Sequence, residues 1–300
     1  MKKFKLITLN FFIFVILVSA ILGAWLTTRV WINTHLSKNE FNGNEAFHFA
    51  EEQIKMGPRG YDGYAHLFIV DWLKFHLLLF GWKVDVQQGE IQGIPVENII
   101  AHRSNLPPKV ILAAHYDTRL YADKDPDPTL RNSPVPGADD GASGVAVLLE
   151  LAKVLPETQN STWLVFFDAE DNGGIDGRSW SMGSQYFVSS LKTLPEKVVI
   201  VDMVGDKVLN IYKERNSDLD LSSEIWSAAG QLGFQESFIS TPKYSLIDDH
   251  LPFVKMGIHA VDIIDFDFPY WHTTHDTIDK ISPQSLEIVG KTLYYWLANP

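Results

Sequence analysis

The chain has 300 residues, of which 46% are hydrophobic, and this length and composition suffice for one domain with a sizeable core. Its 37 acidic residues outnumber the 25 Lys and Arg residues, and the net charge of -12 argues against nucleic-acid binding, because phosphates need a basic surface. The absence of cysteine excludes disulfides, thiolate catalysis and cysteine-ligated zinc. Any transition metal must therefore be held by histidines and carboxylates.

Residues 1–29 are predicted to be a membrane anchor or signal segment. Lysines at positions 2, 3 and 5 precede an apolar run from Leu6 to Leu26. As a helix rising about 1.5 Å per residue, this run would cross the roughly 30 Å hydrocarbon layer, whereas signal-peptide cores are usually shorter. An uncleaved, single-pass transmembrane helix is favoured, with a cytoplasmic N-terminus and an extracytoplasmic domain at residues 30–300. Cleavage after Ala20 remains an alternative and would give a secreted protein.

Residues 30–300 show alternating helix and strand patterns. Apolar periodicity predicts helices over residues 45–54, 66–80, 144–155, 184–191, 221–232 and 283–296. Apolar or extended runs predict strands near residues 82–86, 98–102, 109–114, 163–167, 198–204, 208–212 and 260–264. Continuous apolar strands alternating with helices indicate an α/β fold whose sheet is covered on both faces. The Pro-rich stretch 125–136 is predicted to be a loop near the site.

Residues able to bind a metal follow the predicted strands. The set consists of His115, Asp117, Asp140, Glu170, Asp171 and Asp202. The steps from 115 to 140, 170 and 202 are each close to one strand–helix unit, which predicts that these residues meet at the carboxyl edge of the sheet, where open α/β sheets bind ligands. His272 can join them from a later loop. Zinc suits such a mixture of imidazole and carboxylate ligands and leaves a position open for substrate or water.

Two details of this set bear on its chemistry. Glu170 and Asp171 are adjacent carboxylates that would repel one another unless a cation lies between them or one is protonated. We therefore expect one of them to be a metal ligand and the other a base. Asp117 could accept the imidazole N–H of a neighbouring histidine. Taken singly, each residue is more often a turn or cap residue, and Asp139 and Asp140 could simply cap the helix that follows them. The joint pattern favours a metal site.

Five ordered motifs resemble the zinc-dependent aminopeptidase family of the bacterial leucyl aminopeptidase type. They are His115-Tyr116-Asp117, the segment from Gly137 to Gly144, Glu170-Asp171, the segment from Asp202 to Gly205, and Trp271-His272-Thr273. The resemblance covers the chain from about Ala46 onward. It implies a three-layer αβα fold with a mixed, mostly parallel central sheet. The segments from Asp248 to Phe253 and from Phe268 to His272 look more like the glutaminyl cyclase branch than the peptidase branch.

The cyclase resemblance implies a single zinc ion bound by Asp140, Asp171 and His272. Glu170 would be the acid/base, Asp202 and Asp248 would share its hydrogen-bond network, and Trp271 and Phe268 would contact the substrate. The expected reaction forms pyroglutamate from an N-terminal Gln of a peptide or protein and releases ammonia. This sequence departs from the pattern at Asp171, where Glu is usual, and Trp180 is a candidate substitute for the pocket Trp of the animal enzymes.

The peptidase branch implies an alternative with the same residues. An aminopeptidase would hold two zinc ions bridged by Asp140, with Asp171 and His272 on one, His115 and Asp202 on the other, and Glu170 as base. A third possibility from another class is a non-catalytic ectodomain that binds partners, against which the complete ligand set counts.

Overall fold

The computed structural model describes residues 40–61 and 63–299. The predicted transmembrane helix over the run from Leu6 to Leu26 lies outside the described residues. Within the part that is described, no helix combines the length and apolarity needed to cross a bilayer. Phe41–Pro300 form one compact unit, which carries all the predicted site residues.

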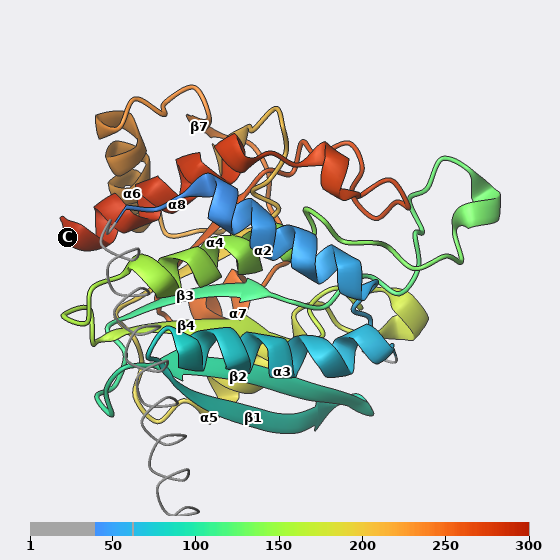
Figure 1. The fold of residues 1–300 in the computed structure, drawn as a ribbon, viewed down its shortest axis with the longest axis horizontal. Coiled ribbons are helices and arrows are strands. Elements are labelled where there is room, and N and C mark those ends of the chain that lie inside the picture. Colours follow the sequence, from blue (N-terminus) through green and yellow to red (C-terminus); the bar gives the residue numbers. More distant parts are fainter. Residues whose placement is uncertain (1–39, 62, 300) are drawn as a thin grey trace, which may run out of the picture. The chain divides into compact units, whose positions relative to one another are not determined.

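A six-stranded mixed sheet forms the centre of the molecule (Figure 1). Its order is β1-β2-β4-β3-β5-β8, built from β1 (Lys83–Ile91), β2 (Ile94–His102), β3 (Val110–His115), β4 (Thr162–Phe167), β5 (Lys197–Asp202) and β8 (His259–Ile264). The last four strands pair in parallel, while β1 pairs with β2, and β2 with β4, in antiparallel fashion. The prediction of a mixed, mostly parallel sheet is confirmed.

Helices cover the sheet on both faces. One buried apolar cluster joins the sheet to α2 (Gly43–Met56), α3 (Tyr64–Leu79), α4 (Ala142–Val154), α6 (Leu219–Gln231) and α8 (Pro283–Ala298). A second cluster joins the other face to α5 (Met182–Ser190) and α7 (His250–Lys255). Short 3-10 turns lie at Pro128–Leu130, Ile175–Gly177 and Ile278–Lys280, and a small parallel pair, β6 (Ile211–Lys213) and β7 (Phe238–Pro242), lies outside the main sheet. The three-layer prediction is therefore confirmed.

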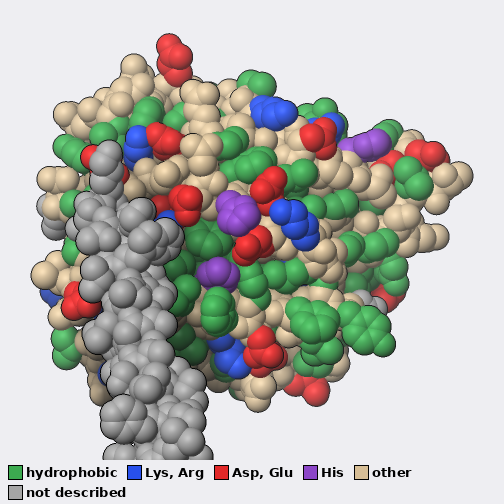
Figure 2. Space-filling model, in the orientation of Figure 1, with side chains coloured by type: hydrophobic (Ala, Val, Ile, Leu, Met, Phe, Trp, Pro, Cys, Tyr) green, Lys and Arg blue, Asp and Glu red, His purple; other side chains and the backbone are tan. Residues whose placement is uncertain are grey.

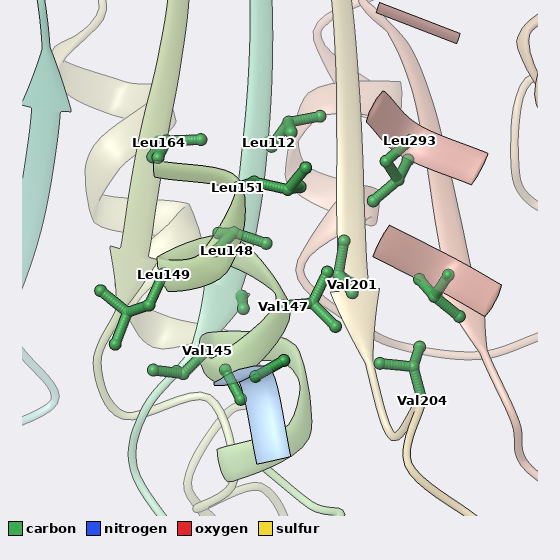
Figure 3. Close-up of a cluster of buried hydrophobic side chains, with 14 of the residues drawn as sticks. Leu112, Val145, Val147, Leu148, Leu149, Leu151, Leu164, Val201, Val204 and Leu293 are labelled. Atoms are coloured by element: carbon green, nitrogen blue, oxygen red, sulfur yellow. The ribbon is translucent and has the colours of Figure 1, made fainter. Parts of the chain in front are cut away.

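Helix α4 lies against the middle of the sheet. Leu148 and Leu151 belong to the same buried cluster as Leu112 of β3 and Val201 of β5 (Figure 3). At Gly144 the helix comes so close to β5 that an added Cβ would lie 2.0 Å from the Val201 carbonyl oxygen. Only glycine permits this approach, which brings the N-terminal end of α4 to the carboxyl end of β5.

Some elements differ from the sequence predictions. The strand near residues 82–86 extends to Ile91 and turns back through Gln92 and Gly93, both at positive φ. Its alternating polar residues suit a partly exposed edge strand, which has no continuous apolar run to detect. Helix α7 has only six residues, too few to show helical periodicity, and it was not predicted. Strand β5 ends at Asp202, two residues before the predicted limit.

Candidate active site and metal centre

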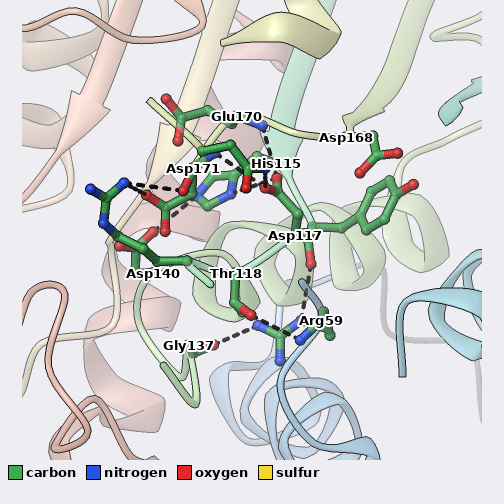
Figure 4. A network of polar contacts seen from close by, with 12 residues as sticks. Arg59, His115, Asp117, Thr118, Gly137, Asp140, Asp168, Glu170 and Asp171 are labelled. Carbon is green, nitrogen blue, oxygen red and sulfur yellow. Dashed lines mark hydrogen bonds and ion pairs between the residues drawn. The ribbon is translucent and has the colours of Figure 1, made fainter. Parts of the chain in front are cut away.

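The predicted metal ligands meet at the carboxyl edge of the sheet. His115 is the last residue of β3, and Asp202 is the last residue of β5. Beyond β4 the chain turns at Ala169, with a φ of 54°, and presents Glu170 and Asp171 toward the same edge. Figure 4 shows His115, Glu170 and Asp171 grouped with Asp140. The convergence expected from the strand ends is therefore present.

Asp140 is fixed by the backbone around it. The carboxylate of Asp276 accepts the N–H groups of Asp139, at 2.8 Å, and Asp140, at 3.1 Å. Gly141, at a φ of 99°, is the N-cap of α4, and no side-chain hydrogen bond caps this fully described helix. Asp139 instead accepts the N–H of Gly205 at 2.6 Å. The capping alternative for Asp139 and Asp140 is thereby removed, and the Asp140 carboxylate is free to face the site.

Asp140, Asp171 and His272 form a first group of candidate ligands, whose ligand atoms all lie within 4.8 Å of one another. His272 Nε2 lies 2.9 Å from Asp171 Oδ1 and 3.6 Å from Asp140 Oδ2. Burial and then the Asp140 charge raise the pKa of Asp171 to about 6. Burial lowers the pKa of His272, but Asp171 and its other carboxylate neighbours outweigh this and raise it to about 9.

A divalent cation fits this first group. The Oδ2 atoms of Asp140 and Asp171 are buried and have no hydrogen-bond partner among the described residues. Buried carboxylates held this close are costly without a compensating positive charge. One imidazole and two carboxylates, with room for a fourth ligand, match the donor set that zinc accepts at catalytic sites.

His115, Asp140 and Asp202 form a second group, also within 4.8 Å. His115 Nε2 lies 3.0 Å from Asp202 Oδ1 and 3.2 Å from Asp140 Oδ1. Burial raises the pKa of Asp202 to about 7, although His115 opposes this shift. Asp140 belongs to both groups, so one chain can present the ligands of a one-metal or a bridged two-metal site.

Asp117 fixes the turn that carries the paired carboxylates. Its two oxygens accept the N–H groups of Glu170, at 3.0 Å, and Asp171, at 3.1 Å. Its Oδ1 also lies 3.4 Å from Nδ1 of His115, but that nitrogen has no hydrogen-bond partner among the described residues, so the expected hydrogen bond from the imidazole is not formed. The backbone hydrogen bonds were not predicted, and they make Asp117 a support for the Glu170–Asp171 turn.

Glu170 lies beside the ligands in a buried position. The Ser181 hydroxyl donates to Glu170 Oε1 at 3.3 Å. Burial, followed by the negative charge of Asp248, raises the pKa of the Glu170 carboxyl well above its usual value. A carboxyl group with a raised pKa can both accept and return a proton near neutral pH, which is the property required of an acid/base catalyst.

A buried polar cluster behind Asp248 was not predicted. His250 Nε2 lies 3.1 Å from Glu214 Oε2, and His250 Nδ1 lies 3.7 Å from Asp262 Oδ2. Asp248, His250 and Asp262 each have one ligand atom within 4.8 Å of the others. His250 follows Asp248 by two residues and could have been noticed, but Glu214, just after β6, and Asp262, in β8, come from distant segments and give no local signal. The cluster places a histidine next to Asp248, whose charge raises the pKa of Glu170.

Arg119 and Asp123 were also missed. Arg119 donates to Asp123 at 2.7 Å and to the backbone carbonyl of Asp171 at 3.2 Å. Asp123 Oδ1 lies 3.5 Å from Nδ1 of His272, so the pair supports two candidate ligands at once. The Pro-rich loop is close to the site as expected, because Asp125 accepts the N–H and hydroxyl of Thr274, two residues after His272.

A cavity of about 200 Å³ opens beside Glu170. Its lining combines Glu170, Asp248 and the candidate ligands other than His115 with Trp180, Leu246, Ile247, Ile264, Phe266 and Trp271. The Trp271 ring stacks on the His272 imidazole with centroids 3.7 Å apart. The Trp180 ring also stacks on the His272 imidazole, with centroids 5.9 Å apart. Phe268, expected at the substrate, is buried with Met203 and Ile264 and is not among the lining residues, whereas Phe266 is.

Comparison with known proteins places this site in a family. Residues 98–297 match the model of peptidase family M28. The chain belongs to this family. A glutaminyl cyclase of Porphyromonas gingivalis is 35% identical, with a TM-score of 0.81 over 86% of this chain and 98% of that one. A Zn-dependent exopeptidase of Parabacteroides distasonis is 31% identical, with a TM-score of 0.80 over 87% and 99%.

Among curated relatives, the aminopeptidase YwaD of Bacillus subtilis is 30% identical over 61% of this chain. The match spans only 39% of YwaD. A glutaminyl cyclase and a zinc-dependent exopeptidase thus resemble this chain to similar degrees. Family membership supports an enzyme, and the zinc-dependent relatives support zinc as its metal.

Proposed function

We propose that this M28 protein is a zinc-dependent glutaminyl-peptide cyclotransferase that converts an N-terminal Gln of a peptide or protein into pyroglutamate. The observation that carries the proposal is the position of Asp248 beside Glu170 in a small cavity walled by Trp271, Trp180 and Phe266. A cavity of this size suits one side chain and its α-amine better than an extended peptide. The 35% identity to a glutaminyl cyclase agrees with it.

The residues of the chain would divide the chemistry between them. Asp140, Asp171 and His272 would hold a zinc ion, which supplies Lewis-acid polarisation of the γ-amide carbonyl when bound. Glu170 would take a proton from the α-amine as its nitrogen bonds to the carbonyl carbon (Cδ) of the side-chain amide, and would give a proton to the amide nitrogen as the bond from Cδ to that nitrogen breaks and ammonia leaves. Trp271 and Phe266 would exclude water, which would otherwise hydrolyse the amide.

Aminopeptidase activity is the second candidate, favoured by one specific observation. His115, Asp140 and Asp202 are preassembled as a second group of ligands that shares Asp140 with the first. Two metals bridged by one carboxylate would suit the hydrolysis of an N-terminal peptide bond with Glu170 as base. The cyclase resemblance implied that Asp202 shares a hydrogen-bond network with Glu170 and Asp248, but among the described residues its carboxylate is hydrogen-bonded to His115. In the cyclase proposal this contact would help to orient the site.

A paired assay with metal analysis tests this proposal. Gln-initiated peptides and Leu-p-nitroanilide should be offered to the same purified protein, with its zinc content measured in parallel. The cyclase proposal predicts pyroglutamate and free ammonia with one zinc per chain. Release of p-nitroaniline with two zincs would establish the aminopeptidase instead. A protein with neither activity and no bound zinc would point to the non-catalytic binding ectodomain.

A further inference from the structure

Helix α3 carries an exposed apolar face. The large hydrophobic residues on this face are Tyr64, Leu67, Phe68, Phe75, Leu78 and Leu79, whose exposed fractions range from 57% to 85%. They recur at helical spacing along one side of Tyr64–Leu79, and Figure 2 shows hydrophobic side chains along the face where α3 runs in Figure 1. Within this fully described helix, Asp71 is the one acidic residue on that side, and it is paired with Lys74 at 3.0 Å.

The core does not account for this face. The opposite side of α3 already supplies the packing, through residues such as Ile69, Leu73 and Leu77, which are fully buried. An ordinary surface helix is apolar on its core side and polar on the other, whereas α3 is apolar on both. Contiguous exposed apolar residues of this size mark an interaction surface. The cavity at the proposed active site is lined by other segments, so the face is separate from the reaction.

The order of segments along the chain indicates what the face contacts. The apolar run from Leu6 to Leu26 precedes α2, the helix that begins at Gly43. Helix α2 packs beside α3, with Phe49 and Trp72 edge to face at 6.2 Å. The connecting residues 27–42 can span at most about 58 Å when fully extended. If the run is the predicted membrane anchor, this short connection holds α2 and α3 near the bilayer.

We propose that the exposed face of α3 lies in the interface of a lipid bilayer and orients the domain on the membrane. The proposal rests on the predicted anchor and not on the proposed reaction. Aromatic and leucine side chains are the residues with which surface-lying helices enter the acyl boundary. The net charge of -12 and the near absence of basic residues on the face point to apolar contact and not to attraction by anionic headgroups.

Site-directed fluorescence on the full chain tests the proposal. The chain has no cysteine, so Phe68→Cys provides a single site for an environment-sensitive fluorophore. The matched control is Ser227→Cys, an exposed site on α6, which packs near β8 at the opposite sheet edge from β1. In phosphatidylcholine vesicles containing nitroxide lipid, quenching at position 68 should exceed that at position 227 by at least about threefold. Equal quenching at the two sites would overturn the proposal.

Two other results would show that something other than lipid covers the exposed face of α3. Disulfide cross-linking between two copies of Phe68→Cys, without quenching by lipid, would show that a second copy of the chain covers the face. A fluorophore that is shielded from water but shows neither cross-linking nor lipid quenching would show that another segment of this chain covers it. Either result overturns the proposal. With the label at Leu78→Cys, the pair Leu67→Ser and Phe75→Ser should lower lipid quenching about threefold, while Leu194→Ser and Val208→Ser, exposed elsewhere, should not. Thermal melts verify that each variant is folded.

Discussion

At the scale of single residues, the site depends on carboxyl groups whose burial raises their pKa values. Glu170, Asp171 and Asp202 are all buried, and their carboxylate neighbours add to the effect of burial. Metal ligands and an acid/base residue need opposite properties, since ligands must be ionised and the catalyst must exchange a proton. In the proposed site the two tasks would fall to the adjacent residues Glu170 and Asp171, and Asp117 accepts the backbone N–H groups of both.

Glu170→Gln should abolish turnover while leaving the metal in place. The amide has the size of the carboxyl group but cannot accept the proton, so kcat should fall by about two to four orders of magnitude. Steady-state kinetics and zinc analysis measure the two effects separately. Glu236→Gln, on an exposed carboxylate, is the control and should keep normal activity. Appreciable turnover by Glu170→Gln would exclude Glu170 as the acid/base.

Asp248→Asn should shift the acidic limb of the pH–rate profile to lower pH. Asp248 is the largest charge that raises the pKa of Glu170, so its neutralisation lowers that pKa and keeps the base ionised in more acidic solution. The limb should not reach the position of an unperturbed carboxyl group, because the contribution of burial to the pKa of Glu170 remains. Ser245→Ala, an uncharged change in the same cavity lining, should leave the limb unmoved. A limb unchanged in Asp248→Asn would contradict the coupling.

The sequence predicted the ligands better than their supports. His115, Asp171 and Asp202 were found because they stand at or close after strand ends, and parallel strands bring such positions to one edge, whereas Asp140 was found at the turn that opens a helix. Arg119 and the cluster of Glu214, His250 and Asp262 act through contacts between distant segments. Such contacts have no signature in local sequence.

At the scale of elements, the approach of α4 to β5 determines whether the ligands can meet. Helix α4 carries Asp140 at its N-terminal end, and β5 carries Asp202 at its last position. Gly144 allows the two to touch, and Asp276 holds the turn before the helix. Small movements of α4 therefore translate directly into the separation of the ligands.

Gly144→Ala should destabilise the protein and weaken zinc binding together. The new Cβ would lie 2.0 Å from the Val201 carbonyl oxygen and push α4 off β5, at a cost of about 1–3 kcal/mol or more. Gly230→Ala in α6 is the matched control, since nothing lies within 4 Å of its added Cβ, and it should be neutral or stabilising by up to about 1 kcal/mol. Denaturant unfolding and zinc titration measure both effects, and equal behaviour of the two variants would refute this role of Gly144.

Element prediction succeeded where burial is complete. Strands β3, β4 and β5 are buried almost throughout and show continuous apolar runs, so they were located nearly to the residue. Strand β1 was found only in part, because its outer half is polar, and β7 was missed because most of it is exposed. Edge strands are stabilised by hydrogen bonds to a neighbouring strand, and these hydrogen bonds leave no pattern in the sequence of the edge strand itself.

At the scale of the whole molecule, metal binding and folding are expected to be coupled. The ligand carboxylates are buried whether or not a cation accompanies them, and a metal that binds only the folded state adds to its stability. Removing zinc by chelation should therefore lower the Tm, and at a free zinc concentration of about 100 times Kd the stabilisation should be about 2.7 kcal/mol. Thermal melts with and without chelator measure this.

The matched variant for this effect is His272→Ala, which removes one ligand. Its Tm should respond much less to chelator or added zinc than that of the parent protein. A parent Tm that is insensitive to chelation would show that the carboxylate cluster is stable without a metal. The convergence on one sheet edge would then be a structural feature of the fold and not a metal centre.

The most direct test of the central claim is anomalous scattering at the zinc absorption edge from crystals of the zinc-loaded protein. The account predicts one peak between the carboxylates of Asp140 and Asp171 and the imidazole of His272, with Glu170 beside it. A second peak of equal height between His115 and Asp202 would favour the aminopeptidase. A zinc ion bound away from Asp140, Asp171 and His272 would contradict the account.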